Sequence, residues 1–419
     1  MNKFLKTLGP GILFASTAIG VSHLVQSTRA GAEYGFTLLW AVILANVLKF
    51  PFFEYGSRYA NITGTSLIDG YKKMGKWMLY LYFIITISTM FFVTAAVGAV
   101  TAGFMDNLFG FSKFIDFKMF PVILVFIITM AILFVGRFNL LDNMMKIIAL
   151  ILFISTFIAF FIAIFRGPTA DINDVITPDI WEPKSVAFII ALMGWMPTAL
   201  DLSTWNSLWT IEKIKQSGYK PTLKETLREY NLGYWISAIL SVCFLTLGAF
   251  LIFGTGIKMP DSGALFANKV ISLYTSTIGK WSYWIIAASG FSIMFGTVLG
   301  LFDGYARALE RASQLIFFNN SDIKKDKVLY SIAVAITGIG GFLVIIIFSG
   351  NQSGFKALVD FATTLSFVVA PVVAVVNYRL VTSKNFPAEG RPGFIMHLLS
   401  VTGIVFLTGF TIYYLWFIL

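Results

Sequence analysis

Charged residues are scarce in this sequence: Asp, Glu, Lys and Arg make up 12% of its 419 residues, whereas 57% are hydrophobic. Soluble domains carry roughly 25% charged residues. A chain this apolar has too little polar surface to cover itself in water, which excludes an ordinary soluble protein. Because the apolar residues are spread evenly, we predict a single transmembrane domain over residues 1–419.

Cysteine and histidine are nearly absent as well. The single cysteine, Cys243, excludes an internal disulfide. There are only two histidines, His23 and His397, and no paired catalytic motif. We therefore expect neither an enzyme nor a bound cofactor.

Basic residues exceed acidic ones and give a net charge of +10. They lie in short clusters between apolar runs, which is typical of membrane loops, so we expect a lipid bilayer and no nucleic acid as partner. Most Lys and Arg fall in loops on one side of the membrane. This bias predicts an inner (plasma) membrane protein with its N-terminus in the cytoplasm and its C-terminus outside. We further expect a monomer.

Long apolar runs recur along the whole chain. Since a membrane-spanning helix needs about 20 apolar residues, we predict about eleven such helices. A β-barrel is excluded because the runs are continuous rather than alternating. The predicted spans are 8–31, 36–57, 77–105, 119–136, 143–166, 185–210, 231–257, 281–312, 328–350, 357–380 and 394–418.

Two of these spans contain helix breakers. The first includes Gly20, and the sixth includes Gly194 and Pro197. Glycine and proline inside a membrane helix free backbone groups, and in many transporters the substrate or a coupling ion takes up those groups. Breaks in spans 1 and 6 also predict an inverted repeat of five plus five helices. Its expected parts are a first repeat at about 5–166, a second at about 185–380 and an extra helix at about 394–418.

Several segments of the first two spans carry a family resemblance. They are Gly9-Pro10-Gly11, Arg29–Gly35, Leu38–Trp40 with Leu44–Asn46, and Thr63-Gly64 after Arg58. These segments resemble the start of Nramp (natural resistance-associated macrophage protein) metal transporters of the APC superfamily. The resemblance implies an all-α LeuT-type fold with helices 1 and 6 interrupted, and secondary transport of divalent metal ions with protons.

The binding motifs of that family are altered in this chain. The Asp-Pro-Gly-Asn motif of span 1 falls on residues 20–23, so that Gly20 replaces the metal-binding aspartate and His23 the asparagine. The Met-Pro-His motif of span 6 keeps Met196 but has Thr198 in place of histidine. We expect the substrate to be bound by Gly20, Ser22, His23, Met196, Thr198 and Asp201.

A metal site without the usual aspartate needs another anionic ligand, because a bare divalent ion is costly to desolvate. Asp201 is the nearest carboxylate to the break in span 6. Together with His23 and Met196 it would suit a transition metal. Asp201 with oxygen ligands alone would suit a harder ion such as magnesium. Alternatively, His23 is a neutral histidine hydrogen-bonded between helices, and Asp201 anchors a helix end.

Other ionisable residues inside the spans are candidates for a coupling or proton pathway. They are Lys49, Glu54, Asp303 and Asp360. Asp303 and Arg307 are four residues apart and can pair on one helix face. Lys49 either snorkels, pairs with Glu54 or Asp201, or stands in for a coupling cation.

Two functions follow from these residues. The first is transport of a divalent metal cation as the substrate, either proton-linked or passive. The second is sodium- or proton-coupled transport of a small organic solute such as an amino acid. In that case Ser22 and Thr198 at the half-helix ends would hold the carboxylate of the solute.

Overall fold

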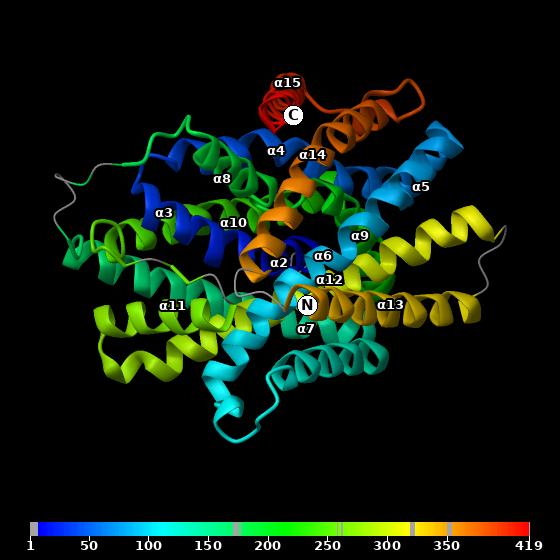
Figure 1. The fold of residues 1–419 in the computed structure, drawn as a ribbon. Helices are drawn as coiled ribbons and strands as arrows, with labels where there is room; N and C mark the ends of the chain where they lie inside the picture. The colour runs from blue at the N-terminus through cyan, green and yellow to red at the C-terminus, as the bar shows by residue number, and fades with distance from the viewer. Residues whose placement is uncertain are drawn as a thin grey trace.

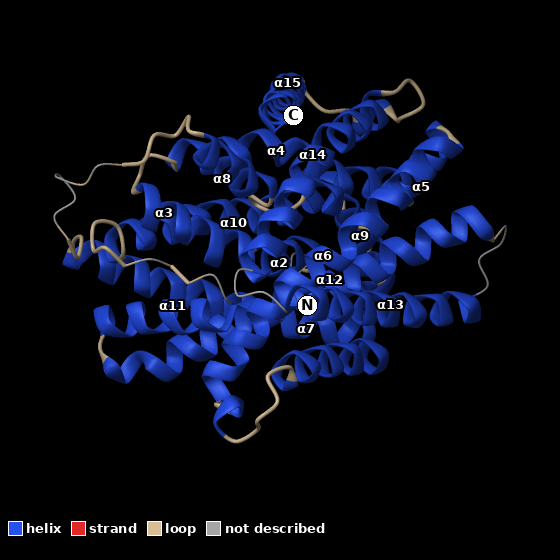
Figure 2. Ribbon diagram, viewed as in Figure 1, coloured by secondary structure: helices blue, strands red, loops and turns tan. Residues whose placement is uncertain are grey.

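The computed structural model describes residues 7–170, 175, 177–257, 259–260, 263–318, 323–349 and 354–418. Throughout these residues the regular structure is helical, without a strand (Figure 2). The elements are α2 (Pro10–Ala18), the π-helix η1 (Val21–Ser27), α3 (Thr28–Tyr34), α4 (Leu39–Thr63), α5 (Leu67–Met74), α6 (Lys76–Phe109), η2 (Phe111–Lys113), α7 (Phe120–Arg166), α8 (Pro183–Gly194), η3 (Leu200–Leu202), α9 (Ser203–Ser217), α10 (Leu223–Leu251), α11 (Gly263–Ile278), η4 (Lys280–Ser282), α12 (Tyr283–Phe317), α13 (Ile323–Ser349), α14 (Gly354–Thr382), η5 (Ala388–Gly390) and α15 (Phe394–Ile418).

The predicted all-α membrane architecture is confirmed. Seven helices of the described part are long and apolar enough to cross a membrane. The others that match predicted spans are α4, which carries charged residues, the short stretch 120–135, and the two interrupted helices. The first interrupted span is built from α2, η1 and α3, and the sixth from α8, η3 and α9.

Helix α7 supplies two spans at once. Its 47 residues would extend about 70 Å if straight, more than twice the ~30 Å hydrocarbon layer. It contains two apolar stretches, Phe120–Val135 and Leu140–Arg166. They correspond to the fourth and fifth predicted spans.

Two helices lie where the sequence predicted only loops. Helix α5 follows span 2 and begins with a capping box, in which Ser66 and Asp69 each bond the other's backbone N–H. Helix α11 lies between α10 and α12. Both were missed because the prediction considered only runs long and apolar enough to span.

The interrupted first span packs tightly against α10. A Cβ atom added to Gly233 would lie 2.0 Å from the Gly11 carbonyl oxygen. Only glycine therefore permits the two backbones to approach so closely, as is common between membrane helices. In Figure 1, α2, α9 and α10 lie within the bundle, whereas α15 lies at its edge against α14 and α4.

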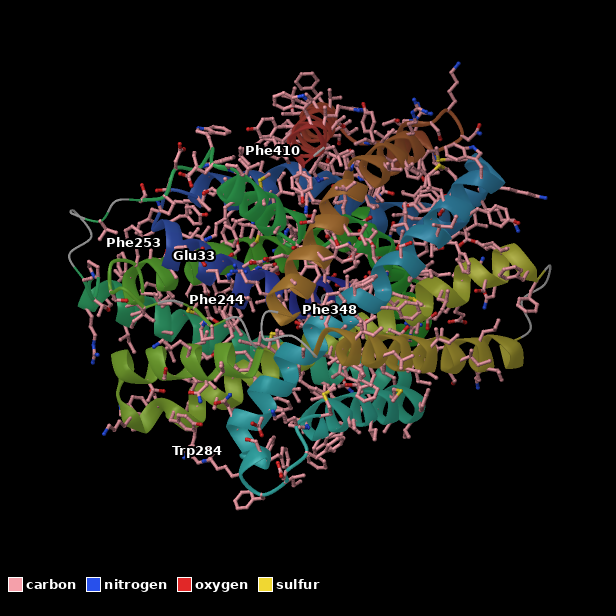
Figure 3. All side chains as sticks on the ribbon, in the orientation of Figure 1. Glu33, Phe244, Phe253, Trp284, Phe348 and Phe410 are labelled. Carbon is pink, nitrogen blue, oxygen red and sulfur yellow. The ribbon has the colours of Figure 1, made fainter. Side chains whose placement is uncertain are left out.

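The outer surface of the bundle is apolar. Trp284 on α12 is 65% exposed and points away from the bundle (Figure 3). Helix α13 exposes a row of aliphatic side chains: Ile332, Ile336, Ile339, Leu343, Ile346 and Ile347. An exposed apolar surface of this extent fits contact with lipid rather than water.

Candidate cation site

The breaks in the first and sixth spans lie in contact with each other. Helix α2 ends at Ala18 and the π-helix begins at Val21, while α8 ends at Gly194 and helical structure resumes at Leu200. The Ser22 hydroxyl lies 3.1 Å from the Pro197 carbonyl oxygen. The structure thus brings together the two segments from which a substrate site was predicted.

His23 is fully buried and both of its ring nitrogens have partners. Nδ1 lies 2.7 Å from the Ser22 hydroxyl. Nε2 lies 3.0 Å from the carbonyl oxygen and 3.2 Å from the hydroxyl of Ser237 on α10. This is the arrangement of a neutral histidine bonded between helices. A metal ion would have to displace one of these bonds to reach the imidazole.

Met196 and Thr198 both lie within the break of span 6. The Met196 side chain is fully buried, and Thr198 is half-buried. The Thr198 carbonyl oxygen points toward Lys49, 3.4 Å from its Nζ atom. Both residues are therefore at the break, as predicted.

Asp201 lies on η3, directly after the break, and is 3% exposed. Its Oδ2 atom accepts a hydrogen bond of 3.0 Å from the Thr89 hydroxyl on α6. Its Oδ1 atom is buried and has no hydrogen-bond partner among the described residues. A buried carboxylate oxygen without a partner is costly, and it is a free acceptor for a ligand.

The surroundings of Asp201 are polar. The charge of the carboxylate acts on one ammonium group and three phenol groups, which belong to Lys49, Tyr71, Tyr82 and Tyr305. The Tyr82 hydroxyl lies 2.6 Å from that of Thr204. These phenol groups come from α5, α6 and α12, and the hydroxyl in direct contact with the carboxylate is that of Thr89 on α6.

Lys49 is fully buried in the middle of α4 and reaches the broken end of α8. Its Nζ atom donates to the carbonyl oxygens of Met193 at 2.7 Å, Gly194 at 2.9 Å and Thr198 at 3.4 Å. An ammonium group has three N–H donors, so all of them are used. Lys49 thus lies at the site, bonded to backbone carbonyls rather than to a carboxylate.

The remaining ionisable candidates lie elsewhere and have partners. Glu54 pairs with Arg58 at 2.6 Å. Asp303 pairs with Arg307 at 2.8 Å and accepts further bonds of 2.8 Å from Trp209 and 2.7 Å from Tyr330. Neither contacts the break, so the predicted alternative of a Lys49–Glu54 pair is not formed.

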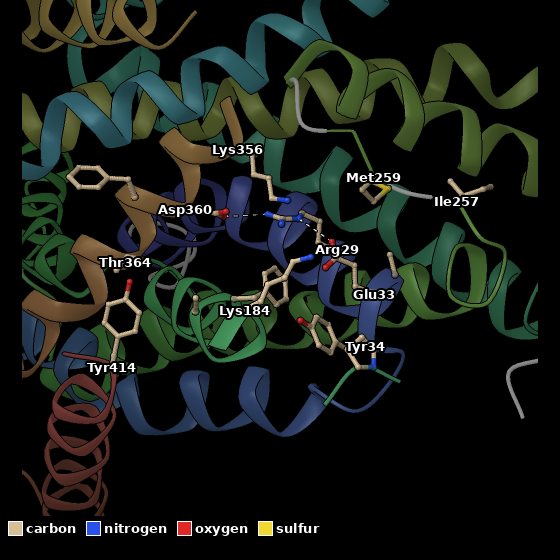
Figure 4. A pocket seen from close by; sticks show the side chains of 15 residues that line it. Arg29, Glu33, Tyr34, Lys184, Ile257, Met259, Lys356, Asp360, Thr364 and Tyr414 are labelled. Carbon is tan, nitrogen blue, oxygen red and sulfur yellow. Dashed lines mark hydrogen bonds and ion pairs between the residues drawn. The ribbon is translucent and has the colours of Figure 1, made fainter. Parts of the chain in front are cut away.

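Asp360 lies in a separate pocket of about 730 Å³ between α3, α8 and α14, which we call the Arg29 pocket (Figure 4). Its charged lining residues are Arg29, Glu33, Lys184, Lys356 and Asp360. Arg29 lies 3.4 Å from Asp360 and 3.7 Å from Glu33, and its guanidinium is stacked 5.0 Å from the Phe188 ring. Arg29 on the first span therefore connects to α14 across this pocket through its ion pair with Asp360.

Comparisons with known proteins agree with this architecture. The family model for Natural resistance-associated macrophage protein-like proteins matches residues 11–417. The chain belongs to the Nramp family. The resemblance seen in the first two spans is thereby confirmed over nearly the whole length.

Individual Nramp relatives and structures give the same result. Uncharacterized protein PM0681 of Pasteurella multocida is 34% identical over 97% of this chain and 91% of its own length. Metal transporter Nramp6 of Arabidopsis thaliana is 22% identical over 99% of this chain and 77% of its own length. The manganese transporter of Eremococcus coleocola, at 12% identity, has the same fold with a TM-score of 0.69, covering 97% of this chain and 85% of that structure.

The departure from the Nramp pattern at Gly20 has a steric explanation. A Cβ atom at this position would lie 2.4 Å from Oγ1 and 2.7 Å from Cγ2 of Thr297 on α12. These distances leave no room for any side chain unless Thr297 moves. The space beside Gly20, where the resemblance places the aspartate of the Nramp motif, is thus filled by the Thr297 side chain.

The donor set at this Nramp site is dominated by oxygen. Within the part of the chain that the structure describes, no group of three or more His, Cys, Asp or Glu residues could hold a metal ion. The available ligands are the free oxygen of Asp201, hydroxyl groups and carbonyl oxygens. Oxygen ligands of this kind suit hard cations.

Sequence reasoning missed the hydroxyl groups around Asp201. Tyr82, Thr86 and Thr89 follow one another at spacings of four and three residues on α6, which places them on one helix face. This polar stripe in an apolar span was the available signal. Sequence reasoning also missed Glu229 on α10. Its buried carboxylate accepts hydrogen bonds of 3.0 Å from the backbone N–H groups of Gly9 and Gly11 at the start of α2.

Proposed function

We propose that this protein is a secondary transporter that moves a divalent metal cation across the membrane, with Asp201 as the carboxylate that binds the cation. The observation that carries the proposal is the free Oδ1 atom of Asp201, buried beside the paired breaks of a chain that belongs to the Nramp family. Relatives in this family bear the name metal transporter.

The charge around Asp201 supports this role. Asp142 also has a buried free oxygen, but the Lys146 and Lys213 ammonium groups lie 2.7 and 2.8 Å from its other oxygen. Asp201 has no ion pair within 4.0 Å among the described residues. Of the two, Asp201 is the carboxylate with capacity for an incoming cation.

The chemistry of the donors favours a hard cation. Since both nitrogens of His23 are engaged by Ser22 and Ser237, the nitrogen ligand of a transition-metal set is already occupied. Asp201 with hydroxyl groups, carbonyl oxygens and retained water fits magnesium or manganese better than a softer metal. The residues proposed to form the substrate site are still Gly20, Ser22, His23, Met196, Thr198 and Asp201. Asp201 contributes the charge, and His23 shapes the site through its hydrogen bonds to Ser22 and Ser237 rather than as a metal ligand.

We further propose an inner (plasma) membrane protein with a cytoplasmic N-terminus and an outer C-terminus, as the distribution of Lys and Arg favours. A monomer is part of the same proposal. The inverted repeats at about 5–166 and 185–380, with the extra helix at 394–418, belong to the same proposal. We also propose that transport of the cation is coupled to protons through Lys49, Glu54, Asp303 or Asp360.

A second candidate is sodium- or proton-coupled transport of a small organic solute such as an amino acid. The Arg29 pocket supports it, because its volume of about 730 Å³ falls in the range of small-molecule sites. Its lining includes three basic side chains, Arg29, Lys184 and Lys356, and two acidic ones, Glu33 and Asp360, so it offers partners for both the carboxylate and the amino group of an amino acid. A bare metal ion would not need a cavity of this size.

Calorimetric titration of the purified protein with magnesium, manganese and calcium tests the proposal. Asp201→Asn should weaken binding of the preferred metal at least about tenfold, or about 1.4 kcal/mol. Asp142→Asn, a buried aspartate already balanced by two lysines, is the matched control and should bind as the wild type does. Absence of saturable metal binding in the wild type would reject the metal and favour an organic solute, which uptake of amino acids into proteoliposomes would then test.

A further inference from the structure

The broken end of α8 presents a cluster of backbone carbonyls that no helix satisfies. Helix α8 ends at Gly194 and the chain is irregular until Leu200, so the carbonyl groups of the last turn lack the regular donors of a continuing helix. Met193 keeps one backbone bond, of 3.4 Å, from the Met196 N–H. The C-terminal end of a helix also carries partial negative charge. Such a cluster inside a membrane attracts a cation.

Lys49 already provides that cation. Its Nζ atom lies within 2.7 to 3.4 Å of three of these oxygens, from Met193, Gly194 and Thr198. The side chain reaches them from α4, 144 residues away from Met193 in sequence, and is 0% exposed. No carboxylate lies within ion-pair distance of Lys49 among the described residues. The ammonium group is therefore held by carbonyl oxygens, as a free monovalent cation would be.

We infer that Lys49 is a specificity-determining residue: a tethered cation that fills the carbonyl site at the end of α8 and excludes a mobile monovalent cation from it. The inference has a direct consequence. The interrupted sixth span needs no sodium ion to be stable, and substrate binding is independent of sodium. It concerns a monovalent site and does not depend on the metal proposed as substrate.

Replacing the ammonium by an apolar group of similar length should open the site. Lys49→Met removes the ammonium donor from three carbonyl oxygens, of which Met193 keeps its 3.4 Å bond from the Met196 N–H. It also removes the ammonium group on which the charge of Asp201 acts. We expect this variant to bind sodium, lithium or potassium at one site, whereas the wild type binds none. Lys49→Arg keeps the charge at the same position and is the matched control, which should also bind none.

The experiment is equilibrium dialysis of the purified full-length protein with radioactive sodium, with choline as the replacement cation and without divalent metal. Thermal unfolding over a sodium series is the second readout, because a ligand that binds only the folded state raises the unfolding temperature. Saturable sodium binding and sodium-dependent stabilisation, in Lys49→Met only, are the expected results.

Equal sodium binding by the wild type would overturn the inference. A folded Lys49→Met protein that binds no monovalent cation would overturn it as well. If Lys49→Met does not fold in choline, sodium in the medium should rescue it. Failure to fold in both media, for Lys49→Met and for Lys49→Gln, would also reject the idea. Divalent titration of the wild type is a separate measurement, so the failure of the proposed function would be recognised independently.

Discussion

Gly20 stands where the Nramp pattern has an aspartate, and the structure predicts the effect of placing even a methyl group there. In Gly20→Ala the new Cβ would lie 2.4 Å from Oγ1 and 2.7 Å from Cγ2 of Thr297. Overpacking of this kind in a dense core costs about 1–3 kcal/mol. Thermal unfolding in detergent, followed by intrinsic fluorescence, should show a correspondingly lower unfolding temperature.

A double-mutant cycle isolates the steric cause. Thr297→Ala removes the two closest atoms, and alone it should cost about 1 kcal/mol because Oγ1 lies within hydrogen-bond distance of the carbonyl oxygens of Ile19 and Ile293. In the Gly20→Ala/Thr297→Ala protein the clash is largely gone, so the two effects should sum to less than their separate values by about 1 kcal/mol or more. Wild-type stability of Gly20→Ala, or strict additivity, would refute the steric explanation.

Three further substitutions test other parts of the structure. His23→Gln should change metal affinity less than about threefold, since the imidazole is engaged by neighbouring hydrogen bonds. A loss of metal affinity above tenfold in calorimetry would instead identify His23 as a metal ligand. Burial would raise the pKa of Asp69, but hydrogen bonding and charge from Arg311 outweigh it and hold the pKa below its ordinary value of 3.8. The Asp69–Arg311 pair therefore stabilises the folded protein at pH values above 3.8, and this contribution is lost as pH falls through the lowered pKa of Asp69. Unfolding temperatures measured from pH 3 to 7 should show this loss in the wild type but not in Asp69→Asn, and identical profiles for the two proteins would reject the prediction. Glu229→Gln removes a negative charge from the N-terminal end of α2 and should destabilise the protein by roughly 0.3–2 kcal/mol, and an unchanged midpoint of thermal unfolding would contradict this.

The membrane spans were predictable because they depend on local composition. In α6 the 29 residues between Lys76 and Asp106 carry no charge, and a run of this kind is recognisable as a span wherever it lies in the fold. Helix α5 does not, since its eight residues are too polar and short to stand out. Its capping box, Ser66 with Asp69, was a local signal for its start that a search for spans overlooks.

The site was only partly predictable because its contacts join distant segments. The breakers Gly20 and Pro197 were visible in the sequence, as was Asp201 beside them. The partners of Lys49 were not, because an ammonium bonded to backbone carbonyls leaves no trace in side-chain identity. Glu54, one of the alternative partners considered for Lys49, instead pairs with Arg58 four residues away, a pairing that the helical spacing does indicate.

The charges at the break also connect its three unusual residues. In the Nramp pattern that this chain resembles, span 1 contributes an aspartate, whereas Gly20 contributes no charge here. Asp201 in span 6 contributes one negative charge, and Lys49 in span 2 contributes one positive charge. A divalent cation would thus enter a site that is neutral overall rather than negative, and Coulomb attraction from Asp201 would be opposed by Lys49. Lys49→Met should therefore increase the affinity for the divalent metal as well as admit sodium, whereas Asp201→Asn should weaken it. If both substitutions weaken metal binding in calorimetry, Lys49 holds the geometry of the break rather than setting its charge.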